Sequence, residues 1–278
     1  MFLGILMKLK ILDYNILHGF YPYDLSISKL LDTKRLNAAQ EIIKLENPDI
    51  VVFTEACFAQ DNVFNIKMDY PKLFGFKYHF HSNVIHAGII NEWGSSLLSK
   101  FPIKEAENYS MKKRGFLRAV LDIKGTLVNI DVLHPHPKLS ENEKARFMKN
   151  CLRDFKNPYI LAGDLNAISP QDNYNKTKLI KGFNTFQDNA EGKINDFMKF
   201  SVIKEILSAG LKDTFKVYHK EFDFTIPTDY LSKNKDSGIR IDYIFCSKDF
   251  KVLDAKIIKN KYSNLASDHY PVIAVLEI

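Results

Sequence analysis

The segment ILAGDLNAIS, residues 160–169, runs from apolar residues straight into an acid, a leucine and an amide. Ile160, Leu161 and Ala162 form a short apolar run, which predicts a buried strand. Asp164 and Asn166 follow where that strand would end. In open α/β sheets, ligands are handled just beyond strand ends, where loops carry polar groups out of a rigid scaffold. The segment therefore predicts a functional strand end, and we ask whether other strands end in the same way.

Further strands and several helices are predicted on either side of this segment, without strict alternation. Predicted strands cover residues 9–16, 49–56, 95–103, a hairpin over 118–134 that turns near Lys124–Gly125, 159–166, 239–247 and 270–278. Predicted helices cover 32–48, with Asp32 or Thr33 as the cap, 140–155, with a capping box from Ser140 to Glu143, and 201–210, closed by Gly210. Residues 170–200 are polar and irregular, and we expect a long surface loop there. The pattern favours one mixed-sheet α/β layered domain over residues 1–278.

Composition narrows the class of protein without identifying it. The 278 residues are 46% hydrophobic and 26% charged, which is ordinary for a globular protein with a substantial core. The net charge of +6 mildly favours an anionic partner such as nucleic acid. The three cysteines are widely spaced and odd in number, so we expect neither a disulfide framework nor a cysteine metal site. The opening apolar stretch is too short to span a membrane. We expect a cytoplasmic monomer without stable membrane association.

Polar residues recur at the ends of the predicted strands. They are Asn15, Glu55, His134, Asp164 with Asn166, Asp242, and Asp268 with His269. Each has an ordinary explanation by itself, such as a turn cap, the start of a loop or a satisfied interior histidine. As a set they are hard to explain in that way, because buried acids and amides are costly unless they are paired or bound to a metal. The set predicts a cleft lined by carboxylates, amides and imidazoles.

This set of side chains indicates a particular chemistry. Carboxylate and amide oxygens without cysteine suit a hard cation, Mg²⁺ or Mn²⁺, better than zinc. A hard cation beside a histidine and a separate aspartate suits hydrolysis of a phosphate ester. The cation neutralises phosphate oxygens, an aspartate orients or deprotonates water, and an imidazole stabilises the developing charge.

Eight motifs follow one another along the chain. They are YNILHG, DIVVFTEA, GSSLLSKFPI, LVNIDVLH, ILAGDLNAIS, FTIPTD, IRIDYIFCS and SDHYPV. In this order they resemble the endonuclease/exonuclease/phosphatase superfamily, which includes pancreatic deoxyribonuclease, abasic-site endonucleases and sphingomyelinases. The resemblance covers nearly the whole chain. Each of these motifs is weak alone, and the ordered set is strong. The resemblance implies a four-layer α/β sandwich, in which two packed mixed β-sheets are flanked by helices.

The resemblance also implies a role for each residue of the set. Glu55 is the expected principal metal ligand, with Asn15 and Asp268 in the metal shell. Asp164 is expected to activate or orient water, Asn166 to hold the phosphate or that aspartate, and His269 to stabilise the transition state, oriented by Asp242. His134 is expected to be a second phosphate-contacting histidine and Arg118 a basic residue near the substrate.

Some neighbouring residues compete for these roles. The segment HPHP offers His136 as a rival to His134, and we favour a solvated loop position for His136. A solvated arginine at a strand edge is an equally good interpretation of Arg118. We expect Lys144, Lys149 and Lys156 to lie on a solvated helix face.

The sequence indicates the identity of the substrate less closely than it indicates the type of reaction. The segments YNILHG, TEA and FTIPTD depart from the pattern of abasic-site endonucleases. The pieces YNI-HG, SKFPI and FT-P are closer to the broad phosphodiesterase branch. With the net charge, this favours a nuclease or DNA-end-processing activity, including tyrosyl-DNA phosphodiesterase activity. The alternatives are a phosphatase or phosphodiesterase acting on lipid head groups or small esters, and a non-catalytic binding module. We expect specificity to reside in residues 18–32, 81–94 and 170–200.

Overall fold

A computed structural model of the chain describes residues 6–21, 31–57, 69–84, 93–111, 114–186 and 188–278. Parts of two predicted specificity segments, residues 22–30 and 85–92, lie outside the described residues.

The strands form two mixed sheets of six strands each. The first sheet has the order β11 (Lys251–Ile257), β12 (Val272–Glu277), β1 (Lys8–Asn15), β2 (Ile50–Cys57), β4 (Trp93–Ser99), β3 (Tyr78–Val84). The second has the order β5 (Ile103–Met111), β6 (Arg114–Ile123), β7 (Thr126–Val132), β8 (Tyr159–Asp164), β10 (Asp242–Cys246), β9 (Lys212–Asp213). Within each sheet one pair is parallel, β1 with β2 and β7 with β8, and the other pairs are antiparallel.

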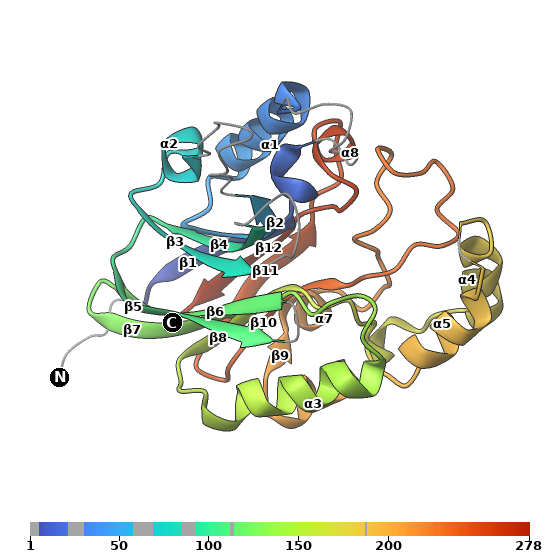
Figure 1. Cartoon of the computed structure of the whole chain (residues 1–278). Helices are drawn as coiled ribbons and strands as arrows, with labels where there is room; N and C mark the ends of the chain where they lie inside the picture. The colour runs from blue at the N-terminus through green and yellow to red at the C-terminus, as the bar shows by residue number, and fades with distance from the viewer. Residues whose placement is uncertain (1–5, 22–30, 58–68, 85–92, 112–113, 187) are drawn as a thin grey trace.

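Helices cover the outer faces of both sheets (Figure 1). The first sheet is covered by α1 (Thr33–Glu46), α2 (Tyr70–Phe74) and α8 (Ser263–Ala266), and the second by α3 (Glu141–Cys151), which packs against α6 (Ser201–Ser208). The short helix α7 (Thr214–Tyr218) follows β9, while α4 (Lys176–Phe183) and α5 (Ala190–Phe197) pack together at one end of the sandwich. Short 3₁₀ turns cover His18–Phe20, Leu152–Asp154 and Pro170–Asp172. This arrangement confirms the predicted four-layer α/β sandwich.

Strand alternation divides the buried side chains among the layers. In β1, Leu9 and Ile11 lie in the core between the two sheets, whereas Leu12 and Tyr14 pack toward the helices that cover the first sheet. Successive side chains of a strand point to opposite faces, and here both faces are buried. This explains why the strands read as continuous apolar runs in the sequence rather than as alternating patterns.

The local signals of the sequence are confirmed where side chains satisfy helix ends or a turn. Asp32, not Thr33, caps α1, because its carboxylate accepts from the backbone N–H groups of residues 34 and 35. The capping box of Ser140 and Glu143 is complete at the start of α3. The hairpin between β6 and β7 turns at Lys124–Gly125, where both residues have positive φ.

The prediction of a long irregular loop over residues 170–200 is wrong. The segment holds α4 and α5, which begin at the capping side chains of Asn175 and Asn189. Leu179, Phe183, Ile194 and Phe197 are buried in a separate small core of apolar residues. Each helix is only eight residues long, so its few apolar residues sit among many polar ones. The high content of polar residues therefore hides the helical spacing of the few apolar residues in this segment.

Cys57, Cys151 and Cys246 are buried, and no disulfide joins them. Among the residues that the structure describes, no helix is long and apolar enough to cross a membrane.

Candidate active site

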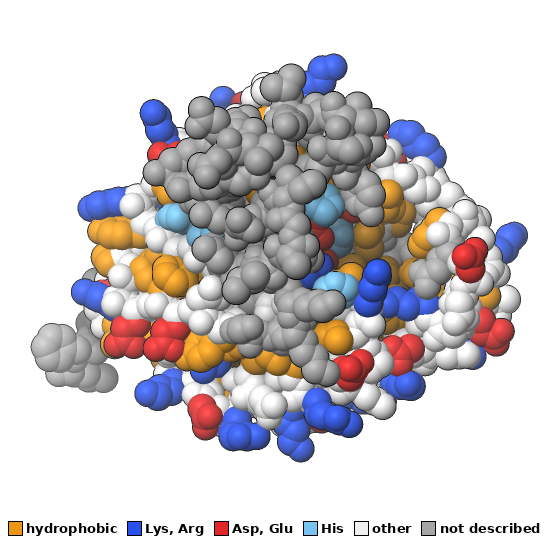
Figure 2. Space-filling model, viewed as in Figure 1, with side chains coloured by type: hydrophobic (Ala, Val, Ile, Leu, Met, Phe, Trp, Pro, Cys, Tyr) orange, Lys and Arg blue, Asp and Glu red, His pale blue; other side chains and the backbone are white. Residues whose placement is uncertain are grey.

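Alternation along four strands directs the predicted polar residues into the space between the sheets. Asp164 lies on the same face of β8 as Ile160 and Ala162, and Asp242 lies on the same face of β10 as Ile244 and Cys246. In the same way, Asn15 follows Ile11 in β1, and His134 follows Val132 at the end of β7. All four side chains therefore meet at one end of the inter-sheet core. Figure 2 shows acidic and histidine side chains together in a hollow at this end.

Asp164 and Asp242 are directly opposed partners in the antiparallel pair β8–β10. Like charges at opposed positions repel each other, and these two carboxylates are 2% and 1% exposed. His269 relieves this repulsion, because its Nδ1 lies 2.8 Å from Oδ2 of Asp242 and its Nε2 lies 3.9 Å from Oδ2 of Asp164. The imidazole is thus held between the two acids.

The pKa values of this group reflect burial and mutual charge. Burial alone would lower the pKa of His269, but the carboxylates of Asp242, Asp268 and Asp164 outweigh it and raise that pKa well above its ordinary value. Burial and the opposed Asp242 raise the pKa of Asp164 to about 7. The raised pKa favours the protonated ring of His269, whose Nδ1 donates to Asp242, while its Nε2 stays 3.9 Å from Asp164.

A bulge in β2 turns Glu55 toward this group. The register between β2 and β4 shifts between Phe53 and Ala56, and Glu55 has a φ of 55°. Regular alternation would have placed Glu55 on the helix-covered face together with Phe53. Instead one carboxylate oxygen accepts the backbone N–H of His18 at 3.2 Å, and the other lies 3.9 Å from Nε2 of His134.

Asn15 connects the two sheets, and Asp268 lies near it and near Glu55. The amide of Asn15 donates to Oδ2 of Asp164 at 3.0 Å, and its side-chain oxygen accepts the backbone N–H of Leu17. The hydroxyl of Ser267 lies 2.7 Å from the carbonyl oxygen of Asn15 and 3.1 Å from Oδ1 of Asp268, so both acceptors lie within reach of its one hydrogen. Burial and the nearby charge of Glu55 raise the pKa of Asp268. Asp268 and Glu55 are therefore close enough to repel each other.

His134 lies among these side chains. His134 is 3% exposed, and its Nε2 lies 3.4 Å from Oδ2 of Asp164. Nδ1 of His136 accepts the backbone N–H of Lys138 within the following loop. Burial and the positive charge of Arg114 lower the pKa of His134 well below its ordinary value, so its ring is neutral.

Arg114 is a member of the group that the sequence analysis missed. It begins β6 and is 7% exposed, with Nη1 2.7 Å from Nδ1 of His134. Burial lowers its pKa to about 10, against the opposing effect of Glu55 and Asp164. Its segment KKRGFLR contains two arginines, and no local signal distinguishes the one that would reach the acids.

The structure does not bring Arg118 into the group. Its guanidinium donates to both carboxylate oxygens of Asp131, at 2.8 and 2.7 Å, and to the carbonyl of Cys151 at the end of α3. Tyr159 also donates to Asp131. Arg118 therefore fastens α3 to the outer face of the second sheet.

Asn166 is held in position by its backbone and by a buried lysine. Its φ is 47°, its N–H donates to Oδ1 of Asp164 at 2.8 Å, and its amide donates to the carbonyl of Pro135. Lys144, which we expected on a solvated face, is 0% exposed; its ammonium donates to the Asn166 carbonyl and lies 3.1 Å from Glu141. Lys149 is exposed on α3 as expected, whereas Lys156 is exposed but lies beyond the helix, before β8.

Two further buried residues support the site. The guanidinium of Arg35, on α1, donates to the carbonyls of Ile16, Leu17, Tyr21 and Ala266, at distances of 2.8–3.0 Å. These carbonyls belong to the segments that carry Asn15 and Asp268, so α1 holds the two segments together. Asp13 lies fully buried on the inter-sheet face of β1, where burial and the charges of Asp242 and Asp164 raise its pKa.

The available donor atoms fit a hard divalent cation. Glu55, Asp268 and Asn15 contribute oxygen atoms and no thiolate, which is the donor set of magnesium and manganese. A cation there would relieve the repulsion that raises the pKa of Asp268. The buried trio of Asp164, Asp242 and His269 also brings ligand atoms within 4.8 Å of one another. In that trio, however, Nδ1 of His269 is already engaged by Asp242.

Comparison with known proteins shows the family of the chain. Residues 14–269 match the sequence model of the Endonuclease/Exonuclease/phosphatase family. No curated protein sequence matches the chain significantly.

Among solved structures, an endonuclease/exonuclease/phosphatase from Bacteroides vulgatus is 15% identical, with a TM-score of 0.69 over 98% of this chain and 99% of that one. An AP endonuclease from Archaeoglobus fulgidus is 19% identical, with a TM-score of 0.66 over 97% and 100%. The 3′ phosphatase NExo from Neisseria, bound to product DNA hairpin, is 17% identical, with a TM-score of 0.61 over 96% and 98%. At these identities the similarity shows a shared fold.

Proposed function

Because the chain belongs to the endonuclease/exonuclease/phosphatase family, we propose that it is a divalent-metal-dependent phosphodiesterase that hydrolyses nucleic acid. The observation that carries this proposal is the position of His269 between Asp242 and Asp164. One aspartate neutralises and orients the imidazolium, which leaves its Nε2–H for a phosphate oxygen. The second aspartate is available to a water molecule on the same side of that phosphate.

Each residue of the group then has a distinct role in hydrolysis. Asp164 orients the water and accepts its proton as the water oxygen bonds to phosphorus. The bond from phosphorus to the leaving oxygen breaks, and that oxygen takes a proton from solvent. His269 donates to the phosphate oxygen on which charge increases, and preorganised donors of this kind act most strongly in a buried site. Arg114 and the amide of Asn166 bind the other phosphate oxygens, and His134 adds a neutral donor beside Arg114.

Glu55, with Asn15 and Asp268, would hold a Mg²⁺ or Mn²⁺ ion, which when bound supplies positive charge to the phosphate. The local structure holds these three residues in position for this role. The β2 bulge fixes Glu55, and the Ser267 hydroxyl lies within hydrogen-bonding distance of Asn15 and Asp268.

Two observations support nucleic acid as the substrate. The chain carries a net charge of +6, which favours a polyanionic partner. Structural neighbours include an AP endonuclease and a 3′ phosphatase bound to product DNA hairpin. Within this class we propose DNA ends, including 5′-tyrosyl DNA, as substrates, because the segments YNILHG and FTIPTD depart from the abasic-site pattern.

A metal-dependent activity panel tests the proposal. Purified protein is incubated with Mg²⁺ or with a chelator on bis-p-nitrophenyl phosphate, single- and double-stranded DNA, an abasic-site duplex, 5′-tyrosyl DNA and sphingomyelin. We expect DNA cleavage that disappears with the chelator. Cleavage of sphingomyelin or the small ester alone would keep the chemistry and reject the nucleic-acid substrate. No hydrolysis of any substrate would favour a non-catalytic binding module.

Substitutions connect any activity to this site. Glu55→Gln should abolish metal-dependent turnover while leaving the circular dichroism spectrum unchanged, and exposed Glu191→Gln is its matched control. His269→Ala should slow turnover by roughly 10²–10³-fold, the usual effect of removing a transition-state donor. His136→Ala should have little effect, because that ring lies in the adjoining loop. Wild-type turnover in either Glu55→Gln or His269→Ala would refute the site assignment.

A further inference from the structure

The motif FTIPTD, residues 224–229, holds none of the predicted site residues, yet it contacts two segments that do. Thr225 and Thr228 of this motif are both 0% exposed. Buried hydroxyl groups in proteins are hydrogen-bonded, because leaving them without a partner is costly. The partners of these two threonines therefore show what the motif does in the fold.

The hydroxyl of Thr225 completes the hydrogen bonding of the backbone at the start of β10. It accepts the backbone N–H of Ile241 at 3.1 Å and that of Asp242 at 3.3 Å. The short strand β9 pairs with the other end of β10, so its pairing stops before Asp242 is reached. Thr225 thus takes the place of a neighbouring strand at the residue that orients the imidazole of His269.

The same motif holds the turn that carries the site histidine. The backbone carbonyl of Thr225 accepts the N–H of Tyr270 at 2.7 Å. The backbone N–H of Thr228 donates to the carbonyl of Asp268 at 3.0 Å, and its hydroxyl donates to the carbonyl of Ser267. Three hydrogen bonds from two buried threonines therefore reach the backbone of residues 267–270.

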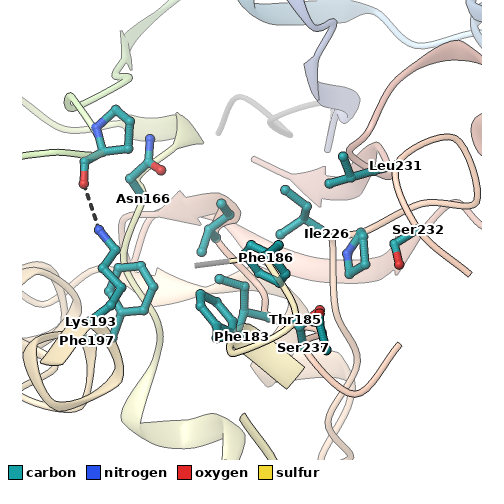
Figure 3. A pocket seen from close by; sticks show the side chains of 14 residues that line it. Asn166, Phe183, Thr185, Phe186, Lys193, Phe197, Ile226, Leu231, Ser232 and Ser237 are labelled. Carbon is teal, nitrogen blue, oxygen red and sulfur yellow. Dashed lines mark hydrogen bonds between the residues drawn. The ribbon is translucent and has the colours of Figure 1, made fainter. Parts of the chain in front are cut away.

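Apolar packing anchors the motif between its two threonines. Ile226 lies in the wall of an apolar pocket of about 430 Å³, on the same side as Leu231 and opposite Phe197 (Figure 3). Asn166 belongs to the same wall, so the pocket adjoins the candidate active site. Ile226 also exchanges backbone hydrogen bonds of 3.1 and 2.9 Å with Ile239. The chain between the threonines is therefore held by contacts that do not involve the site residues.

We propose that Thr225 and Thr228 are positioning residues for the pair of Asp242 and His269, an inference that rests on the proposed phosphodiesterase function. The pair joins two sheets, because Asp242 begins β10 of the second sheet and His269 precedes β12 of the first. Its contact is 2.8 Å from Nδ1 to Oδ2. Thr225 is hydrogen-bonded to the backbone on both sides of this contact, so it sets how far apart the two side chains begin. A displacement of about 1 Å at a reacting group can cost about 10²-fold in rate.

A purely structural role for Thr225 is the alternative, and Thr214 provides the comparison. Thr214 is also 0% exposed, and its hydroxyl donates at 2.7 Å to the carbonyl of Ile244 on the same strand, β10. Thr214→Val and Thr225→Val should both lower the midpoint of urea unfolding, because each leaves buried backbone groups of β10 without a partner. Only Thr225→Val should also change the contact between Asp242 and His269.

The first readout is steady-state hydrolysis of bis-p-nitrophenyl phosphate and of single-stranded DNA with Mg²⁺. We expect Thr225→Val to lower kcat by at least about tenfold with KM within about threefold, because the displaced pair acts in the transition state. Thr225→Ser keeps the hydroxyl and should stay within about threefold of wild-type kcat. Thr214→Val should stay within about twofold.

The second readout does not depend on turnover. In protein labelled with ¹⁵N-histidine, the Nδ1–H proton of His269 is identified by nuclear magnetic resonance as the signal that is lost in His269→Gln. We expect this signal to move, and its proton to exchange faster with water, in Thr225→Val. Thr225→Ser and Thr214→Val should keep the wild-type signal, because the bond from Thr225 to Asp242 is intact in both.

The outcomes separate this inference from the proposed function. A wild-type signal of His269 in folded Thr225→Val would overturn the inference, and so would a Thr225→Ser variant as impaired as Thr225→Val. If the wild-type protein hydrolyses neither ester, the proposed function fails, while a signal that moves in Thr225→Val and not in Thr214→Val still supports the positioning. If Thr225→Val does not fold, Thr228→Val is measured by the same criteria, and a wild-type signal with wild-type kcat there would overturn the inference.

Discussion

The buried lysine beneath Asn166 allows a quantitative test of how the site is supported. Lys144 of α3 is 0% exposed, with its ammonium 3.1 Å from Oε2 of Glu141 and donating to the carbonyl of Asn166. Glu141 is also 0% exposed, and its other oxygen accepts the backbone N–H of Val202 in α6. Lys144→Met keeps the length of the side chain and removes its charge. The change leaves the Glu141 carboxylate buried without its cation and the Asn166 carbonyl without its donor.

The expected loss of stability follows from this burial. Removing one partner of a buried ion pair typically costs about 3–5 kcal/mol, because the remaining charge stays in a poor dielectric environment. Total stabilities of domains are about 5–15 kcal/mol, so the loss would be a large fraction. Adding Glu141→Gln removes the stranded charge and keeps an oxygen for the Val202 N–H. We therefore expect the double variant to lie within about 2 kcal/mol of wild type, and more stable than Lys144→Met.

Urea unfolding at pH 7, followed by circular dichroism, measures these differences. Lys149→Met is the matched control, because Lys149 lies on the exposed face of the same helix and should change stability by less than about 0.5 kcal/mol. A loss below about 1 kcal/mol in Lys144→Met would refute the reasoning. The reasoning would also be refuted if the double variant lost as much stability as Lys144→Met and Glu141→Gln lose separately when their losses are added.

Three further substitutions test other parts of the structure. Gly163→Ala should prevent stable folding or cost several kcal/mol in urea unfolding, because a Cβ at its φ of 133° would lie 2.1 Å from the carbonyl oxygen of Leu133; an Ala variant of wild-type stability would contradict this geometry. Asp242→Asn should lower kcat by about 10²–10³-fold with little change in KM, because the neutral amide no longer stabilises the imidazolium of His269; unchanged kcat would remove Asp242 from the site. Arg118→Met should leave kcat within about twofold but lower stability by about 3 kcal/mol, because the buried carboxylate of Asp131, outside the site, loses its cation. A large loss of kcat without a loss of stability would show instead that Arg118 contacts the substrate.

Local signals in the sequence predicted most of the elements. The cap of α1 at Asp32, the capping box of α3 and the hairpin turn at Lys124–Gly125 depend on residues within a few positions of one another. Such features are readable because their hydrogen bonds close within one turn of the chain. The prediction failed where helices were short and mostly polar, as in α4 and α5.

The identity of individual site residues depended on contacts that no local pattern encodes. Arg114 and Arg118 lie on the same strand and differ in their partners. Arg114 contacts His134, whereas Arg118 contacts Asp131. The helical pattern predicts a solvated Lys144, because a lysine on an amphipathic helix usually faces water. Its burial depends on the fold of the loop that carries Asn166.

The sequence by itself determined the strands that carry the site, their polar ends and the order of motifs that identifies the family, because apolar runs and terminal polar residues are properties of adjacent positions. It did not predict β3, β9 or β11. Only the tertiary structure decided which face each polar residue takes. Strands buried on both sides show no alternation, so neither the meeting of Asn15 with Asp164 across two sheets nor the opposition of Asp164 and Asp242 was visible in the chain. Those positions come from strand register and sheet packing, which are set by contacts between distant segments, and the same contacts place an apolar pocket beside the acids.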